Sequence, residues 1–371
     1  MNLQQRKIKV IISGGGTGGH IFPAVAIANE LKRVNPENEI LFVGAEGRME
    51  MEKVPAAGYK IVGLKIAGIQ RKFDLKNFLL PFKVLSSVMK SRSIIRNFKP
   101  DAAVGVGGYA SGPLLYAASM LHIPSLIQEQ NSFAGITNKI LSKRAKKICV
   151  AYEGMEKYFP EDKIVMTGNP VRQEVIQTEG KKAEALKYFN LDGNKKTVLV
   201  IGGSLGARSI NRSILNGLAR FAEKDIQVIW QTGKGFFQSA KDATNNFAGK
   251  GIHAHEFINR MDLAFSCADV VISRAGASSV SELQLVAKPC ILVPSPNVAE
   301  DHKTKNAFAL VMKQAALLVK DSETEPLLVD AAINLVSDLE KQKQLSKNIS
   351  QLALRDSAAK IVEEIYRIAI H

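Results

Sequence analysis

The sequence predicts an α/β protein with two similar lobes, each built on a parallel sheet, that face each other across a cleft. Short β-branched segments alternate with helical patterns along nearly the whole chain, which is typical of parallel sheets covered by helices. A strand that runs into a glycine-rich turn and then a helix occurs twice, at residues 9–22 and 197–207. The length of 371 residues fits two domains better than one core.

The predicted strands fall into two series. Those of the first lobe are Val10–Ser13, Ile40–Val43, Ala103–Val106, Ser125–Ile127, Lys147–Val150 and Ile164–Met166. Those of the second lobe are Val198–Ile201, Gln227–Gln231, Val270–Ser273 and Ile291–Val293. A polar stretch begins the second lobe, so we predict an N-terminal lobe of residues 1–172 and a C-terminal lobe of residues 173–355. Residues 356–371 form one predicted helix, which we expect to pack back on the first lobe.

The composition indicates a globular protein with an anionic partner. The chain has 46% hydrophobic and 23% charged residues and a formal net charge of +15. Residues 60–99 hold ten basic residues against one acid, Asp74. We do not expect nucleic acid, because no recognised motif is present and the basic stretch has few aromatic side chains. Three scattered cysteines lack metal-ligand spacing and indicate buried free thiols.

The segment Leu75–Phe98 interleaves basic and apolar side chains. A helix with such a surface can lie on an anionic bilayer. Alternatively, its apolar side faces the protein's own core, and the residues alone leave both explanations open. The uncharged stretch of residues 102–128 is long enough to raise the question of a membrane span. We reject a span there, because five glycine and proline positions interrupt the stretch.

The first glycine-rich turn, residues 14–20 (Gly-Gly-Gly-Thr-Gly-Gly-His), is predicted to hold a phosphate. Glycines let backbone N–H groups crowd around a phosphate, and the following helix points its positive end at the same place. The spacing also matches a dinucleotide fingerprint, but the second strand does not end in the acid that would hold a ribose. His20 at the helix start is a candidate base, or alternatively a polar cap that bonds a neighbouring loop.

Two further helix starts suit a diphosphate. Residues 202–206 (Gly-Gly-Ser-Leu-Gly) offer N–H groups and the Ser204 hydroxyl, without the lysine of a nucleotide-hydrolysing P-loop. Residues 273–282 place small residues at a helix N-terminus, with Glu282 one turn later, where it can take two ribose hydroxyls. The alternative is a capping arrangement of Ser278 or Ser279 with Glu282.

Glu129 follows a predicted strand at the sheet edge where α/β proteins bind ligands. It is a second candidate base, or alternatively a carboxylate that caps the next helix. No Asp-x-Asp pair occurs, and His253 and His255 have no acidic companion, so no metal and no cofactor are expected. Helix N-termini and Arg172 would then neutralise a leaving pyrophosphate.

Taken together, these residues resemble the MurG family of N-acetylglucosaminyltransferases. Six motifs occur in the family's order and cover nearly the whole chain. They are residues 15–20, 107–113 (Gly-Gly-Tyr-Ala-Ser-Gly-Pro), 129–131 (Glu-Gln-Asn), 168–172 (Gly-Asn-Pro-Val-Arg), 202–207 and 273–282. The resemblance implies two Rossmann-like lobes in the GT-B architecture. It also implies an inverting, metal-independent transfer, in which the C4 hydroxyl of a muramoyl sugar attacks C1 of N-acetylglucosamine.

The resemblance also implies the substrates and the residues that bind them. The donor is UDP-N-acetylglucosamine, held mainly by the C-terminal lobe, and the acceptor is undecaprenyl-pyrophosphoryl-N-acetylmuramoyl-pentapeptide, which meets the first glycine loop. Pyrophosphate binding falls to Ser204 and to Ala277, Ser278, Ser279, Val280 and Ser281. Glu282 holds the ribose, and the backbone at Ile258 reads the uracil. Thr17, Gly18, Gly19, Asn131 and Arg172 complete the donor site, while His20, with Glu129 second, takes the proton.

One position departs from the family pattern. Lys303 stands where the family usually has a glutamine that contacts the donor sugar, and an ammonium only donates hydrogen bonds. The family acts on a lipid-anchored acceptor, so the resemblance favours the anionic bilayer as partner of Leu75–Phe98. It places the protein on the cytoplasmic face of the bacterial inner membrane, as a peripheral protein. The alternative enzyme is a UDP-N-acetylglucosamine 2-epimerase, which shares the two-lobed fold and the donor.

Overall fold

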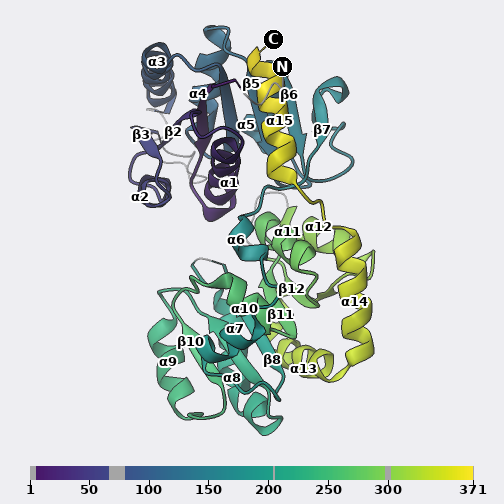
Figure 1. The fold of residues 1–371 in the computed structure, drawn as a ribbon. Coiled ribbons are helices and arrows are strands. Elements are labelled where there is room, and N and C mark those ends of the chain that lie inside the picture. Colours follow the sequence, from purple (N-terminus) through teal and green to yellow (C-terminus); the bar gives the residue numbers. More distant parts are fainter. Residues whose placement is uncertain (1–5, 67–79, 204, 297–301, 371) are drawn as a thin grey trace. The chain divides into compact units, whose positions relative to one another are not determined.

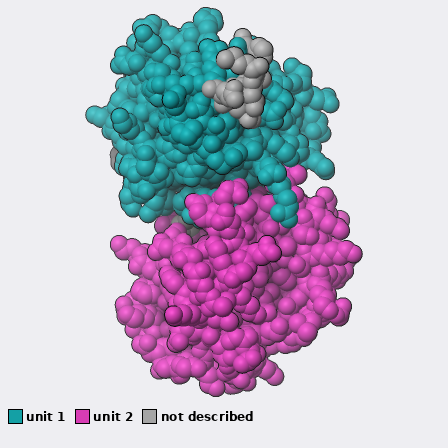
Figure 2. Space-filling view, in the orientation of Figure 1, with its two compact units in different colours: residues 1–172, 355–371 teal, residues 173–354 magenta. Residues whose placement is uncertain are grey.

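The computed structural model describes residues 6–66, 80–203, 205–296 and 302–370. The chain divides into two compact units (Figures 1 and 2). Unit 1 comprises Met1–Arg172 and Arg355–His371, and unit 2 comprises Gln173–Leu354. Each unit contains one sheet in which all the strand pairs are parallel, so the predicted α/β class is confirmed.

Unit 1 has a seven-stranded sheet in the order β3-β2-β1-β4-β5-β6-β7. Its strands are β1 (Lys9–Gly14), β2 (Glu39–Ala45), β3 (Lys60–Leu64), β4 (Ala102–Gly107), β5 (Ser125–Glu129), β6 (Lys147–Val150) and β7 (Ile164–Met166). The chain reverses its direction of strand addition between β1 and β4. Ligands of open parallel sheets bind at the carboxyl ends of strands beside such a switch point.

The helices of unit 1 cover both faces of its sheet. They are α1 (Gly18–Val34), α2 (Glu50–Ala56), α3 (Leu80–Phe98), α4 (Ser111–Met120), α5 (Ile136–Ser142), the 3₁₀ turn η3 (Glu161–Lys163) and α15 (Ser357–Ile370). One core lies between the sheet and α1 with α15, and a second lies between the sheet and α3, α4 and α5. The central strand β4 is buried from Ala102 to Val106, which explains its continuous apolar sequence.

The C-terminal helix α15 belongs to unit 1 although 182 residues of unit 2 precede it (Figure 1). Its side chains Ile361, Val362, Ile365 and Tyr366 are buried against α1 and the sheet. The Tyr366 hydroxyl accepts a hydrogen bond of 2.8 Å from Asn38 Nδ2. Four buried side chains at about 1.5–3 kcal/mol each make α15 an integral part of the unit 1 core.

Unit 2 has a six-stranded sheet in the order β10-β9-β8-β11-β12-β13. Its strands are β8 (Thr197–Ile201), β9 (Gln227–Gln231), β10 (Ile252–His255), β11 (Val270–Arg274), β12 (Cys290–Val293) and β13 (Leu317–Leu318). Its helices are α6 (Gln173–Ile176), α7 (Lys182–Phe189), α8 (Arg208–Glu223), α9 (Phe237–Asn245), α10 (Met261–Cys267), α11 (Ala277–Val286), α12 (His302–Val311), η5 (Asp321–Glu323), α13 (Thr324–Ser337) and α14 (Leu339–Gln351). Two hydrophobic cores again flank the sheet.

All ten predicted strands are present, with ends within two residues of those predicted. The structure adds β3, β10 and β13, which the sequence did not reveal. β10 reads Ile-His-Ala-His and β13 has two residues, so neither carries a run of β-branched residues. The helix expected from about Phe22 begins at Gly18, and the one expected from about Ala207 begins at Arg208. Glycines conceal the first helix start, because their helix propensity is low.

Candidate active site

The first glycine loop of unit 1 connects β1 to α1. Gly16 adopts a φ of +84°, in the left-handed region that glycine tolerates. Thr17 is the N-cap of α1 in an extended conformation, so Gly18, Gly19 and His20 form the first helical turn. Thr17 and Gly19 are exposed. The His20 N–H donates to the Thr17 carbonyl at 3.1 Å, so the N–H groups of Gly18 and Gly19 are the ones that this turn can offer an anion.

His20 lies half-buried over this loop. Its Nδ1 is 3.0 Å from the carbonyl oxygen of Gly15. A carbonyl oxygen only accepts, so this hydrogen bond requires the proton on Nδ1, and in the neutral imidazole the lone pair is then on Nε2. The ring packs over Gly107, where an added Cβ would lie 2.9 Å from Nε2. The loop and Gly107 therefore fix the imidazole in the tautomer that a general base needs.

Glu50 holds the same loop from behind, and it was not among the predicted site residues. The side chain is 1% exposed. Its Oε2 accepts a hydrogen bond of 2.8 Å from Gly16 N–H, and its Oε1 accepts one of 3.0 Å from Ala45 N–H. It is the first residue of α2, directly after the β2 turn. An acid at the start of the helix after β2 was the available signal, but Glu52 lies in the same turn, so the signal does not single out Glu50.

Glu129 orders the loop that follows β5. Its Oε1 accepts from Asn131 N–H at 3.1 Å, and its Oε2 accepts from Gly135 N–H at 3.0 Å and from Asn138 Nδ2 at 2.8 Å. The side chain is 2% exposed. Gly135 is the N-cap of α5, so the carboxylate has the geometry expected of a structural cap. It also holds Asn131 in place.

Arg172 lies beside the first turns of α1. Its guanidinium carbon is 4.5 Å from the centroid of the Phe22 ring, a cation–π contact. The segment that leads to Arg172 is fixed by buried amides: Gln128 Nε2 donates to Asn169 Oδ1 at 3.0 Å, and Asn169 Nδ2 donates to the Gln130 carbonyl at 3.1 Å. Unit 1 therefore brings Arg172 and the His20 helix turn together.

The second glycine loop, in unit 2, connects β8 to α8. Gly203 and Gly206 have φ values of +89° and +76°. A Cβ on Gly206 would overlap the carbonyl oxygen of Thr232, so the loop and the end of β9 are in backbone contact. Leu205 is 82% exposed. Ser204, the predicted phosphate ligand, lies outside the described residues.

The helix start of α11 lies at the carboxyl end of β11, next to β8. The N-cap is Gly276, so a serine cap paired with Glu282 is not the arrangement present. Ser278 Oγ is buried and has no hydrogen-bond partner among the described residues. The Val280 and Ser281 side chains are buried, and the Val280 N–H donates to the Gly276 carbonyl at 2.9 Å, so the N–H groups without an acceptor inside α11 are those that precede Val280. Ser279 and Glu282 are partly exposed, and Glu282 lies in the second turn.

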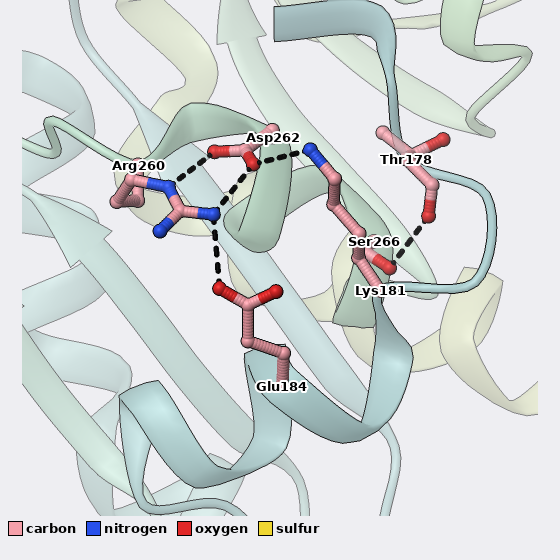
Figure 3. Close-up of polar contacts among 6 residues, drawn as sticks. All are labelled: Thr178, Lys181, Glu184, Arg260, Asp262 and Ser266. Carbon is pink, nitrogen blue, oxygen red and sulfur yellow. Dashed lines mark hydrogen bonds and ion pairs between the residues drawn. The ribbon is translucent and has the colours of Figure 1, made fainter. Parts of the chain in front are cut away.

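Ile258 lies in the segment between β10 and α10. Its side chain is 4% exposed, and its N–H donates to Gln231 Oε1 at 2.9 Å. The helix that follows is anchored by charged groups (Figure 3). Asp262 accepts from Arg260 at 2.9 Å and from Lys181 at 2.8 Å, and Arg260 also reaches Glu184 at 3.0 Å. The Arg260 hydrogen bonds, helped by Lys181, lower the pKa of Asp262.

Comparisons with known proteins match nearly the whole chain. Residues 10–150 match the model of the glycosyltransferase family 28 N-terminal domain, and residues 197–364 match that of its C-terminal domain. The UDP-N-acetylglucosamine--N-acetylmuramyl-(pentapeptide) pyrophosphoryl-undecaprenol N-acetylglucosamine transferase of Parabacteroides distasonis is 58% identical, over 98% of this chain and 99% of its own. The transferase of the same name from Bacteroides thetaiotaomicron is 57% identical over similar shares.

The chain belongs to glycosyltransferase family 28, in the MurG family. The crystal structure of Acinetobacter baumannii MurG has a TM-score of 0.76 and 26% identity, and covers 98% of this chain and 100% of that one. A solved UDP-N-acetylglucosamine 2-epimerase, at 15% identity and a TM-score of 0.68, shares the fold. The predicted family and the two-lobed GT-B fold class are thus confirmed.

Two family positions carry predictions that the described residues do not reach. Lys303 lies in α12, whose first side chains, at residues 302–304, are outside those described, as is Ser204.

Among the described residues, no group of His, Cys, Asp and Glu has a geometry that could hold a metal ion. The three cysteines are buried and unpaired, and burial raises the pKa of Cys149 to about 12.

Helix α3 carries the apolar and basic segment of this family member. Its inner face, with Val88 and Ile95, is buried. Its outer face leaves Phe82, Leu85 and Met89 exposed by 71%, 61% and 55%. Packing against the protein's own core therefore accounts for the inner face of α3. It does not account for the exposed apolar side chains of the outer face. Among the described residues, no helix is long and apolar enough to cross a membrane.

Proposed function

We propose that this chain transfers N-acetylglucosamine from UDP-N-acetylglucosamine to the muramoyl C4 hydroxyl of undecaprenyl-pyrophosphoryl-N-acetylmuramoyl-pentapeptide. The identity of 58% over 98% of the chain to a transferase named for this reaction supports the proposal. The observation that carries it is local: the unpartnered Ser278 hydroxyl lies at the N-terminus of α11. β11 pairs with β8 in the same sheet, so their carboxyl ends lie side by side. One of these ends leads into α11 and the other into the second glycine loop.

Unit 2 is the donor-binding unit in this proposal. The β-phosphate and α-phosphate lie between the second glycine loop and the first turn of α11, where two helix N-termini offer N–H groups. The described residues contain no donor to the Ile258 carbonyl, while its N–H is taken by Gln231. A free carbonyl accepts the N3–H of uracil and is repelled by the N3 lone pair of cytosine. The ribose hydroxyls go to Glu282.

Unit 1 supplies the base. The acceptor C4 oxygen attacks C1 of N-acetylglucosamine from the face opposite UDP, the C1–oxygen bond to UDP breaks, and the hydroxyl proton passes to His20 Nε2. Nε2 suits this role because the Gly15 carbonyl holds the proton of the ring on Nδ1. Glu129 acts as a positioning residue for Asn131, since its oxygens are occupied by the loop.

Charge on the departing UDP is neutralised without a metal. Helix N-termini contribute about 0.3–2 kcal/mol each toward an anion. In unit 2 the first turn of α11 offers such a contribution, and in unit 1 the first turn of α1 and the Arg172 guanidinium do so. Turnover that persists in excess EDTA is the expected result.

The exposed outer face of α3 docks on the anionic bilayer that carries the acceptor. Phe82, Leu85 and Met89 enter the headgroup boundary, and the basic residues of the helix meet lipid phosphates. The double variant Phe82→Ser, Leu85→Ser should lose sedimentation with anionic vesicles. Met312→Ser is the control, because Met312 is 81% exposed in unit 2 and has no such role. Equal sedimentation of both variants would contradict the docking surface.

The decisive experiment incubates the protein with UDP-N-acetylglucosamine, with and without the lipid-linked muramoyl acceptor, and measures UDP release and the sugar products. Release that depends on the acceptor, together with a disaccharide-lipid product, supports the transferase. Formation of the 2-epimer in the absence of acceptor, with or without net release of UDP, would assign the epimerase reaction instead. UDP binding without any release would indicate a binding protein that is not an enzyme.

A further inference from the structure

Gln231, the last residue of β9, connects two segments of unit 2 through its carboxamide. Its Nε2 donates to the Gly203 carbonyl at 3.1 Å, and its Oε1 accepts from Ile258 N–H at 2.9 Å. Because one backbone partner only accepts and the other only donates, the orientation of the amide is fixed. The side chain is 2% exposed, so it cannot exchange these partners for bulk water.

The two bridged segments are the ones that bind different parts of the donor. Gly203 belongs to the glycine loop after β8, which holds the diphosphate in the proposed function. Ile258 belongs to the segment after β10, which reads the base. Gln231 ends the strand between β8 and β10, so its amide spans from one segment to the other.

Close backbone packing makes this region stiff. A Cβ on Gly233 would overlap the backbone of Leu205, and one on Gly206 would overlap the Thr232 carbonyl. The glycine loop thus rests directly on the residues that follow Gln231. A side chain that bonds such a loop on one side and the Ile258 backbone on the other controls their spacing.

We propose that Gln231 is a positioning residue that sets the distance between the diphosphate-binding loop and the base-reading segment. It thereby sets the affinity for uridine diphosphate and its sugars. This inference rests on the proposed function of unit 2 as the donor-binding unit. Gln231 lies behind both segments and bonds only backbone groups of them, so its loss weakens ground state and transition state alike. Such a loss raises KM and leaves kcat nearly unchanged.

The test compares Gln231→Met with Gln227→Met. Gln227 is on the same strand, is 1% exposed and is also bonded through both ends of its amide, but at the opposite end of β9. Both variants remove a buried amide of equal size, so both should lower the melting temperature by a similar amount. Gln231→Met should also raise the KM for UDP-N-acetylglucosamine and the Kd for UDP about tenfold, which corresponds to about 1.4 kcal/mol. Its kcat should stay within about threefold.

Gln227→Met should leave KM, Kd and kcat within about twofold of the wild type. Equal KM values for the two variants would overturn the inference. If Gln231→Met does not fold, Gln231→Asn serves instead, since its shorter amide can keep one bond and should raise KM about threefold; an unchanged KM would again overturn the inference.

Failure of the inference and failure of the proposed function are distinguishable, because UDP binding by calorimetry needs no acceptor. A wild-type protein that binds UDP but transfers no sugar refutes the transferase and leaves the Kd comparison valid. A wild-type protein that does not bind UDP refutes the donor site, and with it this role of Gln231.

Discussion

Replacing Glu50 by glutamine tests whether a buried carboxylate holds the catalytic loop of unit 1. Glutamine has the same shape but one acceptor oxygen, whereas Glu50 serves two N–H donors, of Gly16 and Ala45, with separate oxygens. In the variant, one of these N–H groups faces the amide NH₂ and is left without an acceptor. A buried donor that loses a charged acceptor costs about 2 kcal/mol.

That cost has two measurable consequences. For a unit of this size, about 2 kcal/mol lowers the melting temperature by about 4–8 °C. The Gly15 carbonyl that binds His20 Nδ1 belongs to the residue before Gly16, so displacement of the loop also moves the base. A displacement of about 1 Å at a catalytic group can cost about a hundredfold in rate. We therefore expect Glu50→Gln to lower acceptor-dependent UDP release by at least about tenfold.

Differential scanning calorimetry and the UDP-release assay measure the two effects. Glu39→Gln is the matched control, because Glu39 begins the same strand, β2, but is 40% exposed and pairs with Lys7 and Lys9 at the surface. It should change stability by no more than about 0.5 kcal/mol. If Glu50→Gln melts and turns over as the wild type does, the loop is not held by this carboxylate and the reasoning fails.

Three further predictions use other parts of the structure. His20→Ala should lower turnover by at least about tenfold while UDP binding survives, whereas His122→Ala, at an exposed site of unit 1, should not; unchanged turnover would remove His20 from the mechanism. Because the folded-state pKa of Asp262 is lowered, its contribution to stability is present above the unfolded-state pKa and is lost as the pH falls below about 4. Asp262→Asn should therefore lower the free energy of unfolding of unit 2 at neutral pH. It should also weaken the fall of that free energy as the pH drops below about 4, measured by chemical denaturation at several pH values. An unchanged fall would contradict the role of this ion cluster. Tyr366→Ala should cost about 3–5 kcal/mol, since the ring is 1% exposed in the unit 1 core; a loss below about 1 kcal/mol would show that α15 is not part of that core.

Local sequence determined much of the fold. The ten predicted strands are short segments between helical patterns, and central ones such as β8 are apolar and buried on both faces, which is typical of a parallel sheet covered by helices. The glycine turns were also predicted from sequence, because Gly16, Gly203 and Gly206 adopt positive φ values that are unfavourable for other residues. The helix-start positions of His20 and Glu282 follow from these local rules.

The tertiary structure decided what the local pattern left open. Glu129 could be a base or a cap by sequence, and the geometry of a cap depends on Gly135 and Asn138, which only the folded loop brings to its oxygens. Glu50 and Gln231 were not predicted, because their hydrogen-bond partners are backbone groups of distant segments. A pattern of side chains in the sequence does not show which backbone groups come close together. Strand pairing creates those contacts, so burial and hydrogen bonding across the sheet, rather than composition, assign the residues that support the site.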